Sequence, residues 1–178
     1  DTSTSMPRIP RNQPGGYDPG VTYAEFSPDG EVKAGGVSLR SIYTLSDALK
    51  FKSITSWRYF HQDPMAQDGD GEAVGKSTNV NAYNQNAFTQ EFQLLGSFKR
   101  INFVLGAFLF HENYRSRRNT FTNTYIGSLP RLQDSDVVTD SAAAFGQATF
   151  DLNDTLSIVG GLRFTHDHRK SDFTLYLD

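Results

Sequence analysis

The chain has 178 residues, of which 37% are hydrophobic and 13% aromatic, with no cysteine and a formal net charge of -3. The lack of cysteine excludes disulfides, thiol catalysis and cysteine-ligated metals. The balance of 17 basic and 20 acidic residues leaves no basic stripe, so no nucleic-acid partner is expected. The sequence contains no apolar run of about eighteen residues, which excludes a membrane-spanning helix. Barrel strands remain possible, because each needs only about ten residues of alternating polarity.

The N-terminal region differs in composition from the rest of the chain. Residues 1–34 hold most of the prolines, interleaved with glycines, and this mixture predicts a long irregular loop. The first five residues are polar and do not begin with Met, so no signal peptide is visible. We therefore expect a processed or excised segment of a longer protein.

A first β-hairpin is predicted from residue 35 onward, where apolar and polar residues begin to alternate. The two strands cover about 36–45 and 49–62, and Ser46-Asp47 between them is typical of a tight turn. In the second strand every charge falls on one phase, which holds Lys50, Lys52 and Arg58, and the opposite phase holds Leu49, Phe51, Trp57 and Tyr59. The two faces of this hairpin are therefore expected to meet different surroundings.

Two more hairpins follow with the same pattern. Their strands are predicted over about 87–98 and 101–114, then 141–152 and 155–167, with short turns at Lys99-Arg100 and Asn153-Asp154. The alternation is blurred in 101–114, because Val104, Phe108 and Phe110 make the second phase apolar too. Long polar connections are predicted at about 63–86 and 115–140, and residues 171–178 begin a further loop or strand.

The spacing of the connections bears on the fold class. Tight turns and loops of more than about twenty residues alternate along the chain, and this is the connection pattern of outer-membrane barrels. Such loops are uncommon inside compact soluble domains, and the predicted strands exceed the usual five or six residues. The same alternation also occurs in soluble β-sandwiches and small barrels. The pattern favours a transmembrane barrel and leaves a secreted binding module open.

The third hairpin resembles a known family. Residues 141–167, which read SAAAFGQATFDLNDTLSIVGGLRFTHD, are similar to a barrel segment of TonB-dependent outer-membrane receptors. The segments FTQEFQL at 88–94, INFVLGAFLF at 101–110 and SITSWR at 53–58 resemble further segments of these receptors, in the same order. The resemblance spans residues 36–168.

This resemblance implies an all-β fold: about six strands, as three hairpins, from the wall of a 22-stranded antiparallel transmembrane β-barrel. It implies that residues 1–34 and the two long connections are extracellular and that the plug domain of the family is absent from this chain. It further implies a bacterial outer-membrane receptor, not an enzyme, that imports a scarce nutrient such as a ferric siderophore or another iron complex. Its implied partners are the TonB complex, reached through the missing plug, and the surrounding lipid and lipopolysaccharide.

In a barrel of this family one phase of each strand faces the lumen and the other faces lipid. The lumen-facing residues are then Lys50, Lys52, Arg58, Glu91, Gln93, Gln147 and Arg163. The lipid-facing residues are Phe51, Trp57, Phe92, Leu94, Leu105, Ile158 and Leu162. Charges on the lipid face cost a few kcal/mol, which explains why that phase lacks them. Trp57 and Tyr59, near the loop end of their strand, are expected in an aromatic girdle.

A cluster of basic residues is the candidate ligand-binding site. Tyr114, Arg115, Arg117 and Arg118 stand at the extracellular end of the fourth strand, where guanidinium groups would bind an anionic iron chelate or a lipopolysaccharide phosphate. The alternative is a solvated strand end whose charges serve only solubility.

No cofactor, metal site or catalytic residue is predicted. Asp68, Asp70 and Glu72 lack the spacing of a calcium loop, and His166 with His168 supplies only two metal ligands. No nucleophile elbow, phosphate loop or metalloprotease helix is present in the sequence. Two functions therefore remain beside the transporter: a secreted β-sandwich that binds carbohydrate or a similar ligand, and an outer-membrane barrel enzyme for which no catalytic set is visible.

Overall fold

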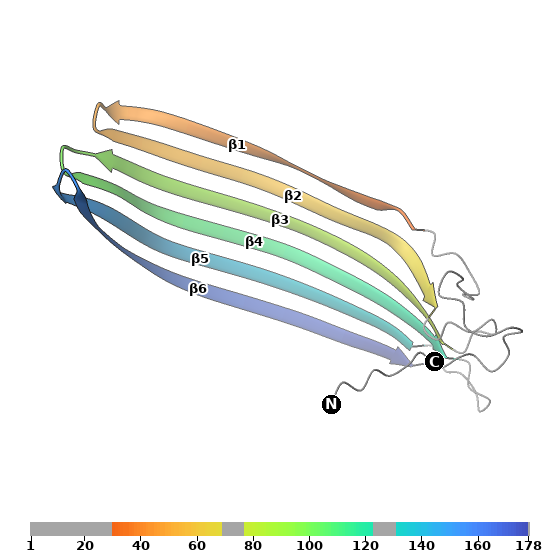
Figure 1. The fold of residues 1–178 in the computed structure, drawn as a ribbon. Coiled ribbons are helices and arrows are strands. Elements are labelled where there is room, and N and C mark those ends of the chain that lie inside the picture. Colours follow the sequence, from red (N-terminus) through yellow and green to blue (C-terminus); the bar gives the residue numbers. More distant parts are fainter. Residues whose placement is uncertain (1–29, 69–76, 123–130, 178) are drawn as a thin grey trace, which may run out of the picture.

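The structure, a computed structural model, describes residues 30–68, 77–122 and 131–177. Six antiparallel strands form one sheet in the order β1-β2-β3-β4-β5-β6, so every strand pairs with its neighbours in sequence (Figure 1). The strands are β1 (Val32–Ser46), β2 (Leu49–Asp68), β3 (Ser77–Ser97), β4 (Ile101–Thr122), β5 (Arg131–Asn153) and β6 (Leu156–Leu177). The predicted three hairpins and all-β class are confirmed.

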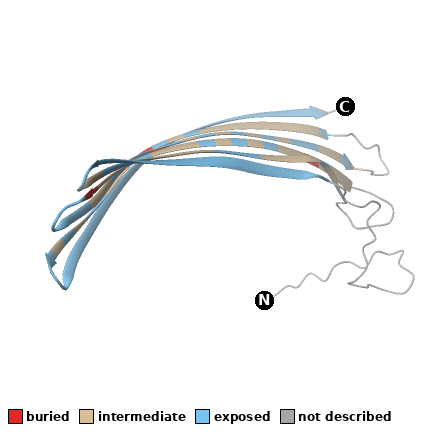
Figure 2. Cartoon of the chain, turned by 90° about the horizontal axis from the view of Figure 1, so that it is seen from above, coloured by how far each residue is buried: buried red, intermediate tan, exposed pale blue. Residues whose placement is uncertain are grey.

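The sheet is a single curved layer (Figure 2). Large apolar side chains stay exposed, with Leu162 at 82%, Phe164 at 71% and Tyr43 at 70%. A soluble domain does not leave so much contiguous apolar surface in water. Within the described residues no second sheet covers this surface, as a β-sandwich would require. The alternative of a secreted β-sandwich does not match this arrangement, and β1 and β6 each keep one edge unpaired in the sheet.

The short turns form where polar side chains hydrogen-bond to the local backbone. In the first turn the Ser46 Oγ accepts a hydrogen bond from the Ala48 backbone N–H at 3.3 Å. In the third turn the Asn153 Oδ1 accepts one from the Thr155 N–H at 2.9 Å. The second turn is closed by backbone bonds between Phe98 and Ile101. Such side-chain bonds explain why Ser-Asp and Asn-Asp marked turns in the sequence.

The register of the sheet determines the tilt of its strands. One row of paired residues runs from Lys50 to Leu95, Val104, Gln147 and Gly161. These residues are the second of β2, the fourth of β4 and the sixth of β6. From one strand to the next, the row of paired residues therefore moves about one residue further from the short turns. With a rise of about 3.3 Å per residue and a strand spacing of about 4.8 Å, this shift corresponds to a tilt of about 35°. Transmembrane barrels have strands tilted by roughly 35 to 45°.

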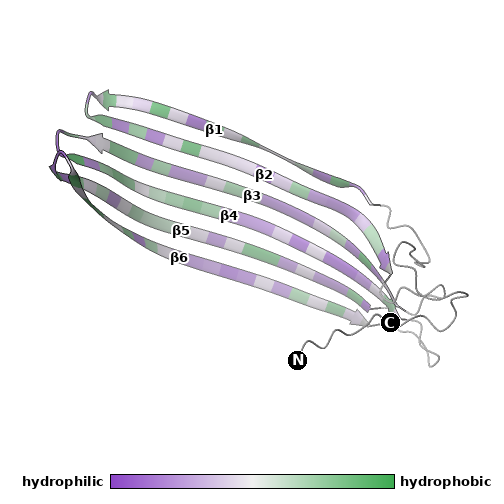
Figure 3. Ribbon diagram, in the orientation of Figure 1, coloured by the Kyte–Doolittle hydropathy of each residue, from purple (hydrophilic) through white to green (hydrophobic). Residues whose placement is uncertain are grey.

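Pairing divides the strand residues into two faces. Along β4 the half-buried residues alternate with exposed ones, such as Leu105 at 52% and Leu109 at 48%. Side chains crowd on the inside of a curved sheet, so we call the half-buried side the concave face and the other the convex face. The alternation of polarity along the strands is visible in Figure 3. The convex face includes Leu39, Phe51, Trp57, Phe88, Phe92, Leu94, Leu105, Leu109, Ile158, Leu162 and Phe164.

Glycines in the sheet lie opposite aromatic rings. A Cβ added to Gly106 would overlap the ring of Phe145, its partner on β5, and one added to Gly96 would overlap the ring of Phe103, its partner on β4. Glycine normally weakens a strand. Here each glycine lets a ring lie flat across the neighbouring strand, which covers the backbone and packs the two strands together.

The convex face changes from apolar to amphipathic residues at the same distance from the short turns on β2, β4 and β6. Counted from the short turns, the ninth residues of β2, β4 and β6 are Trp57, Leu109 and Phe164, and the eleventh residues are Tyr59, His111 and His166. At a tilt of 35°, ten residues rise about 27 Å. The apolar band of an outer-membrane barrel is about 25 Å tall and ends in a girdle of amphipathic residues. We call Tyr59, His111 and His166 the girdle residues.

The strands continue past the girdle, which corrects the predicted loop bounds. The connection predicted at 63–86 is occupied up to Asp68 by β2 and from Ser77 by β3, and that at 115–140 is occupied by β4 up to Thr122 and by β5 from Arg131. β1 begins at Val32, inside the predicted 1–34 loop, and β6 runs to Leu177. Beyond the girdle both faces are polar, so hydrophobic alternation no longer signals a strand. Residues 1–29, 69–76 and 123–130 lie outside the described part.

Candidate functional site

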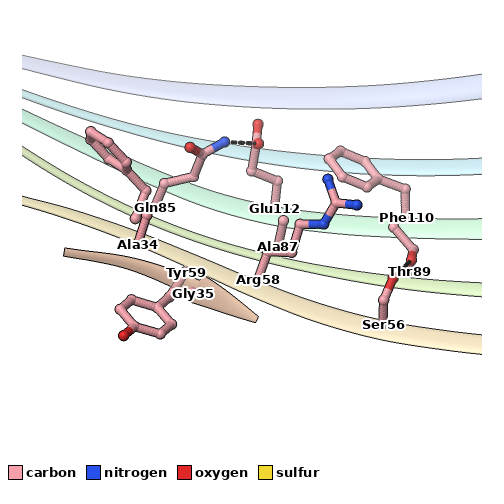
Figure 4. Close-up of a pocket in the computed structure, with 11 residues that line it drawn as sticks. Ala34, Gly35, Ser56, Arg58, Tyr59, Gln85, Ala87, Thr89, Phe110 and Glu112 are labelled. Atoms are coloured by element: carbon pink, nitrogen blue, oxygen red, sulfur yellow. Dashed lines mark hydrogen bonds between the residues drawn. The ribbon is translucent and has the colours of Figure 1, made fainter. Parts of the chain in front are cut away.

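The concave face carries a hollow of about 500 Å³ beside Arg58. Its lining comes from β1, β2, β3 and β4. The concave-face residues are Ala34, Ser56, Arg58, Phe60, Gln85, Ala87, Thr89, Phe110 and Glu112, and the convex-face residues Gly35 and Tyr59 lie between them along β1 and β2 (Figure 4). Arg58 is the tenth residue of β2, so the hollow lies level with the girdle, at the end of the apolar band furthest from the short turns. We call it the Arg58 hollow.

Hydrogen bonds fix most polar groups of the Arg58 hollow but leave its cation free. The Gln85 Nε2 donates to the Glu112 Oε1 at 2.5 Å, and the hydroxyls of Ser56 and Thr89 lie 2.7 Å apart. Within the described residues, the Arg58 guanidinium forms no ion pair or hydrogen bond. A guanidinium with five donors and no internal acceptor is suited to a carboxylate, phenolate or phosphate.

Glycine on β1 makes room for this arginine. Gly36 lies opposite Arg58, and a Cβ there would come within 3.0 Å of the Arg58 Cγ and 2.6 Å of the Trp57 carbonyl oxygen. The absence of a side chain at Gly36 therefore leaves the Arg58 stem its place on the concave face. Phe60 and Phe110 supply apolar walls, so the hollow combines the Arg58 guanidinium, the hydrogen-bonded Glu112 carboxylate and aromatic surface.

The residues predicted to face the lumen share the concave face. These are Lys50, Lys52, Arg58, Glu91, Gln93, Gln147 and Arg163. Arg163 packs against aromatic rings, with its guanidinium carbon 5.9 Å from the Phe108 centroid and 5.7 Å from the Phe145 centroid. This packing gives Phe108, the residue that blurred the alternation of β4, a partner in a cation–π contact.

The predicted ligand cluster at the end of β4 is divided between the two faces. Tyr114 and Arg118 lie on the concave face, where Tyr114 stacks on Tyr83 at 6.3 Å and the Arg118 Nε donates to the Asn81 Oδ1 at 2.9 Å. Arg115 and Arg117 lie on the convex face, where they form ion pairs with acidic residues of β5. The four side chains therefore do not converge on one ligand. Ligand binding by them stays a prediction.

The sequence did not single out several residues of the Arg58 hollow. Gln85 falls inside the predicted loop at 63–86, and Glu112 is not among the predicted site residues. One signal was present: Glu112 shares its phase with Phe108 and Phe110, so it continues the unusual second phase of that strand. The sequence alone does not give the pairing register of β2, β3 and β4, and this register brings Gln85, Glu112 and Arg58 together.

Neither a metal-binding cluster nor a membrane-spanning helix is found in the described residues. They contain no group of three or more His, Asp or Glu side chains arranged to hold a metal ion, and Asp70 and Glu72 lie outside them. In the described part of the chain no helix is long and apolar enough to cross a membrane.

Comparison with known proteins identifies the family. The chain matches the TonB dependent receptor-like β-barrel family over residues 1–177. It belongs to that family. The pesticin receptor of Yersinia enterocolitica is 26% identical over 159 residues, which are 86% of this chain and 22% of that protein. The crystal structure of the ferric yersiniabactin uptake receptor FyuA from Yersinia pestis superposes with a TM-score of 0.66 at 21% identity, over 84% of this chain and 22% of that one.

Family membership confirms three predictions from the sequence. The chain is a fragment of a TonB-dependent receptor barrel, its six strands belong to the barrel wall, and its place is the bacterial outer membrane. The family is one of receptors, not of enzymes. The chain spans about a fifth of the length of the relatives it matches, 22% in both cases.

Proposed function

We propose that this chain supplies wall, lumen lining and loops to a receptor that imports a scarce nutrient, an iron chelate of the ferric siderophore class. The observation that carries the proposal is the Arg58 hollow, in which a guanidinium without an ion pair lies between aromatic walls, beside a Glu112 carboxylate that accepts a hydrogen bond from Gln85, on the concave side of a barrel wall. The name of one relative supports the iron assignment, since it is a ferric yersiniabactin uptake receptor.

In this proposal the concave face lines the lumen and the convex face meets lipid. A chelate enters from the loop end of the strands and meets Tyr114 and Arg118, then Arg58, where its negative groups accept hydrogen bonds from the guanidinium. The aromatic rings of Phe60 and Phe110 contact its apolar parts. Energy for release comes from the TonB complex, acting through a plug domain elsewhere in the polypeptide.

The convex face has a different role in the same scheme. Arg115 and Arg117 lie beyond the girdle and point away from the lumen, so their surroundings are the outer-leaflet lipopolysaccharide and not the imported ligand. The girdle residues mark the level at which hydrocarbon ends, because Tyr and His present an apolar ring and a polar edge.

Uptake of radioactive iron tests the proposal. The full-length receptor is expressed in Gram-negative cells that lack their own iron receptors, and a panel of ferric chelates labelled with radioactive iron is offered. We expect accumulation from at least one chelate, abolished by loss of TonB or by collapse of the proton gradient. Failure of every chelate in cells with correctly inserted receptor would contradict the iron assignment.

Two arginine variants then locate the ligand. Arg58→Ala removes a charged donor, and loss of such a hydrogen bond corresponds to roughly ten- to hundredfold in affinity. Arg115→Ala is the matched control, since its guanidinium lies on the convex face. Equal effects of the two variants on the half-saturating chelate concentration would rule out the Arg58 hollow as the binding place.

A further inference from the structure

All four histidines of the chain lie on the convex face within one narrow band. They are His61, His111, His166 and His168, and each pairs across the sheet with convex-face residues. His111 and His166 are the eleventh residues of β4 and β6, and His61 and His168 are the thirteenth residues of β2 and β6. Two residues of a strand tilted by about 35° rise about 5 Å. We call these four residues the histidine belt.

The histidine belt determines the sign of the charge on this face. Among the described side chains, the other charged groups of the convex face at or beyond the girdle are cations and carboxylates. The cations are Lys33, Arg115, Arg117 and Lys170. The carboxylates are Glu31, Asp63, Asp134, Asp136, Asp140 and Asp172. With neutral imidazoles the face carries an excess of two negative charges, and with four imidazolium groups it carries an excess of two positive charges.

One carboxylate lies between two members of the histidine belt. Asp140 of β5 lies opposite His111 of β4 and also opposite His168 of β6. The His111 Nδ1 is 2.7 Å from the Asp140 Oδ1, and its Nε2 is 3.0 Å from the amide nitrogen of Asn113. This arrangement suits the neutral ring, in which the Nδ1–H donates to the carboxylate and Nε2 accepts from the amide. Protonation of Nε2 replaces this acceptor with a second donor.

His61 is arranged for the charged form of the ring. Its Nε2 is 2.9 Å from the Asp63 Oδ1, and its Nδ1 contacts the Asn84 Oδ1, so both ring nitrogens face acceptors. An imidazole donates from both nitrogens only as the imidazolium. The hydrogen bonds to Asn84 and Asp63 accordingly raise the pKa of His61. Lys33 lies opposite His61 on β1 and is paired with Glu31.

The two histidines of β6 continue toward a lysine. His166, His168 and Lys170 are successive convex residues of this strand, about 6 to 7 Å apart. Asp140 of β5 lies opposite His168, and Asp172, the next convex residue of β6, is 3.5 Å from the Lys170 Nζ. When both imidazoles are protonated, three successive convex residues of β6 are therefore cationic.

We propose that the protonated histidine belt binds the phosphate groups of outer-leaflet lipid. Lipid headgroups begin where the apolar band of the convex face ends, which is the level of the belt. Imidazolium groups form charge-assisted hydrogen bonds to phosphate oxygens. An unperturbed imidazole gains its proton near pH 6.5, so the outer face attracts phosphate in mildly acidic medium and repels it in alkaline medium.

The apolar band favours a lipid over a free phosphate ion as the occupant of the histidine belt. A lipid whose phosphate meets the belt places its acyl chains against Leu109 and Phe164, convex residues on the side of the belt nearer the short turns. The belt also lies on the outside of the barrel wall, where a domain in the lumen does not reach it. This inference goes beyond import, because it concerns the surroundings of the barrel and not its cargo.

Binding of lipid A to the full-length receptor tests the proposal. The probe is diphosphorylated lipid A, added to receptor purified in a neutral detergent, and native mass spectrometry gives the half-saturating concentration at about pH 5.5 and about pH 8. We expect binding to be at least about fivefold tighter at the lower pH. The belt-free variant carries His61→Gln, His111→Gln, His166→Gln and His168→Gln and should lose this preference.

Two further variants separate protonation of the histidine belt from charge in general. His166→Lys together with His168→Lys fixes the positive charge, and we expect it to bind lipid A at about pH 8 at least about threefold more tightly than the wild type. Lys170→Gln removes a cation that does not titrate between these pH values. It should weaken binding at both pH values by the same factor and leave the preference for the lower pH intact.

Three results would overturn the proposal. Equal binding of dephosphorylated lipid A would mean that the acyl chains alone are recognised, and a wild-type pH preference in the belt-free variant would mean that other groups titrate. Displacement of lipid A by inorganic phosphate at equal phosphate concentration would mean that the belt binds the free ion. Heat-dependent gel mobility reports whether each variant is folded, and if the belt-free variant is not, the lysine variant decides. Iron uptake does not enter this measurement, so the import function and the lipid contact stand or fall separately.

Discussion

Arg115 and Asp136 lie directly opposite each other on β4 and β5, and two hydrogen bonds join their side chains. The Arg115 Nε donates to the Asp136 Oδ1 at 2.5 Å and its Nη2 donates to the Oδ2 at 3.0 Å. Arg115 is the fifteenth residue of β4, four beyond the girdle residue His111, so the pair lies outside the apolar band. The hydrogen bonds from Arg115 hold the pKa of the Asp136 carboxyl below its usual value.

The lowered pKa of Asp136 predicts an acid-dependent loss of stability. A carboxyl whose pKa is depressed in the folded state stabilises the fold at pH above its unfolded pKa, and this contribution is lost as pH falls through the folded pKa. Asp136→Asn should therefore unfold at lower urea concentration than the wild type at neutral pH, by a small margin because the pair is exposed. The margin should shrink once pH falls below the usual carboxyl pKa of 3.8 and vanish below the lowered pKa of the folded state.

Urea unfolding of the full-length receptor, followed at several pH values, checks this prediction. Arg115→Gln should remove the same pH dependence, and adding it to Asp136→Asn should have little further effect, because the two residues act as one pair. A difference between wild type and Asp136→Asn that persists undiminished at pH 3 would show that the carboxylate does not gain its stability from ionisation.

The packing of Phe145 over Gly106 predicts a large effect from a small substitution. In Gly106→Ala the new Cβ would overlap the Phe145 ring, and overpacking of this kind costs about 1 to 3 kcal/mol in the free energy of unfolding. Gly160→Ala is the control, since nothing lies within 4 Å of its Cβ position. It should change stability by no more than about 0.5 kcal/mol.

Unfolding by urea in lipid or detergent measures both glycine variants. If the ring is the cause, Gly106→Ala should cost less in a Phe145→Leu background, because the smaller side chain leaves room for the methyl group. Equal costs for Gly106→Ala and Gly160→Ala would mean that the loss of glycine flexibility, and not the ring, sets the effect.

The strand pattern near the turns was predictable because the membrane enforces it. Between Leu49 and Trp57 one phase must be apolar for lipid and the other polar for water, so alternation in the sequence reports the strand. Beyond the girdle residue His111, water lies on both sides and no such rule applies. The last part of β4, up to Thr122, therefore looked like a loop, although its backbone pairs regularly with β3.

The candidate site was only partly predictable for a related reason. Period-two alternation assigns Arg58 and Arg163 to one face without any knowledge of neighbours. It equally separates Arg115 from Arg118, three positions apart, once the strand is known to continue through them. The Arg58 hollow needs more than periodicity, because Gln85 and Glu112 come to it through the registers of β3 with β2 and β4. A single strand's sequence does not carry those registers.

A charge on the convex face should prevent membrane insertion. Leu162 is the seventh residue of β6, below Phe164, and it is 82% exposed on the apolar side. Leu162→Arg would place a cation in hydrocarbon at a cost of about 2 to 4 kcal/mol near mid-bilayer. Thr165→Arg, on the concave face of the same strand, is the control. We expect the heat-dependent gel mobility of folded barrel to be lost or reduced only for Leu162→Arg, and loss in both variants would contradict the assignment of faces.

The most direct test of the account is a spin-label scan of β4 in the membrane. The 178 residues contain no cysteine. Single cysteines introduced from Ile101 to Arg118 can therefore each carry a nitroxide, in a full-length receptor from which any cysteine outside these residues has been removed. Collisions with oxygen report lipid, and collisions with a water-soluble nickel complex report water. We predict oxygen maxima at Phe103, Leu105, Ala107 and Leu109, nickel maxima or burial at the residues between them, and water on both faces from Asn113 onward. A scan without this period of two, or with oxygen maxima at Val104, Gly106 and Phe108, would contradict the claim that the convex face of this sheet meets the outer membrane.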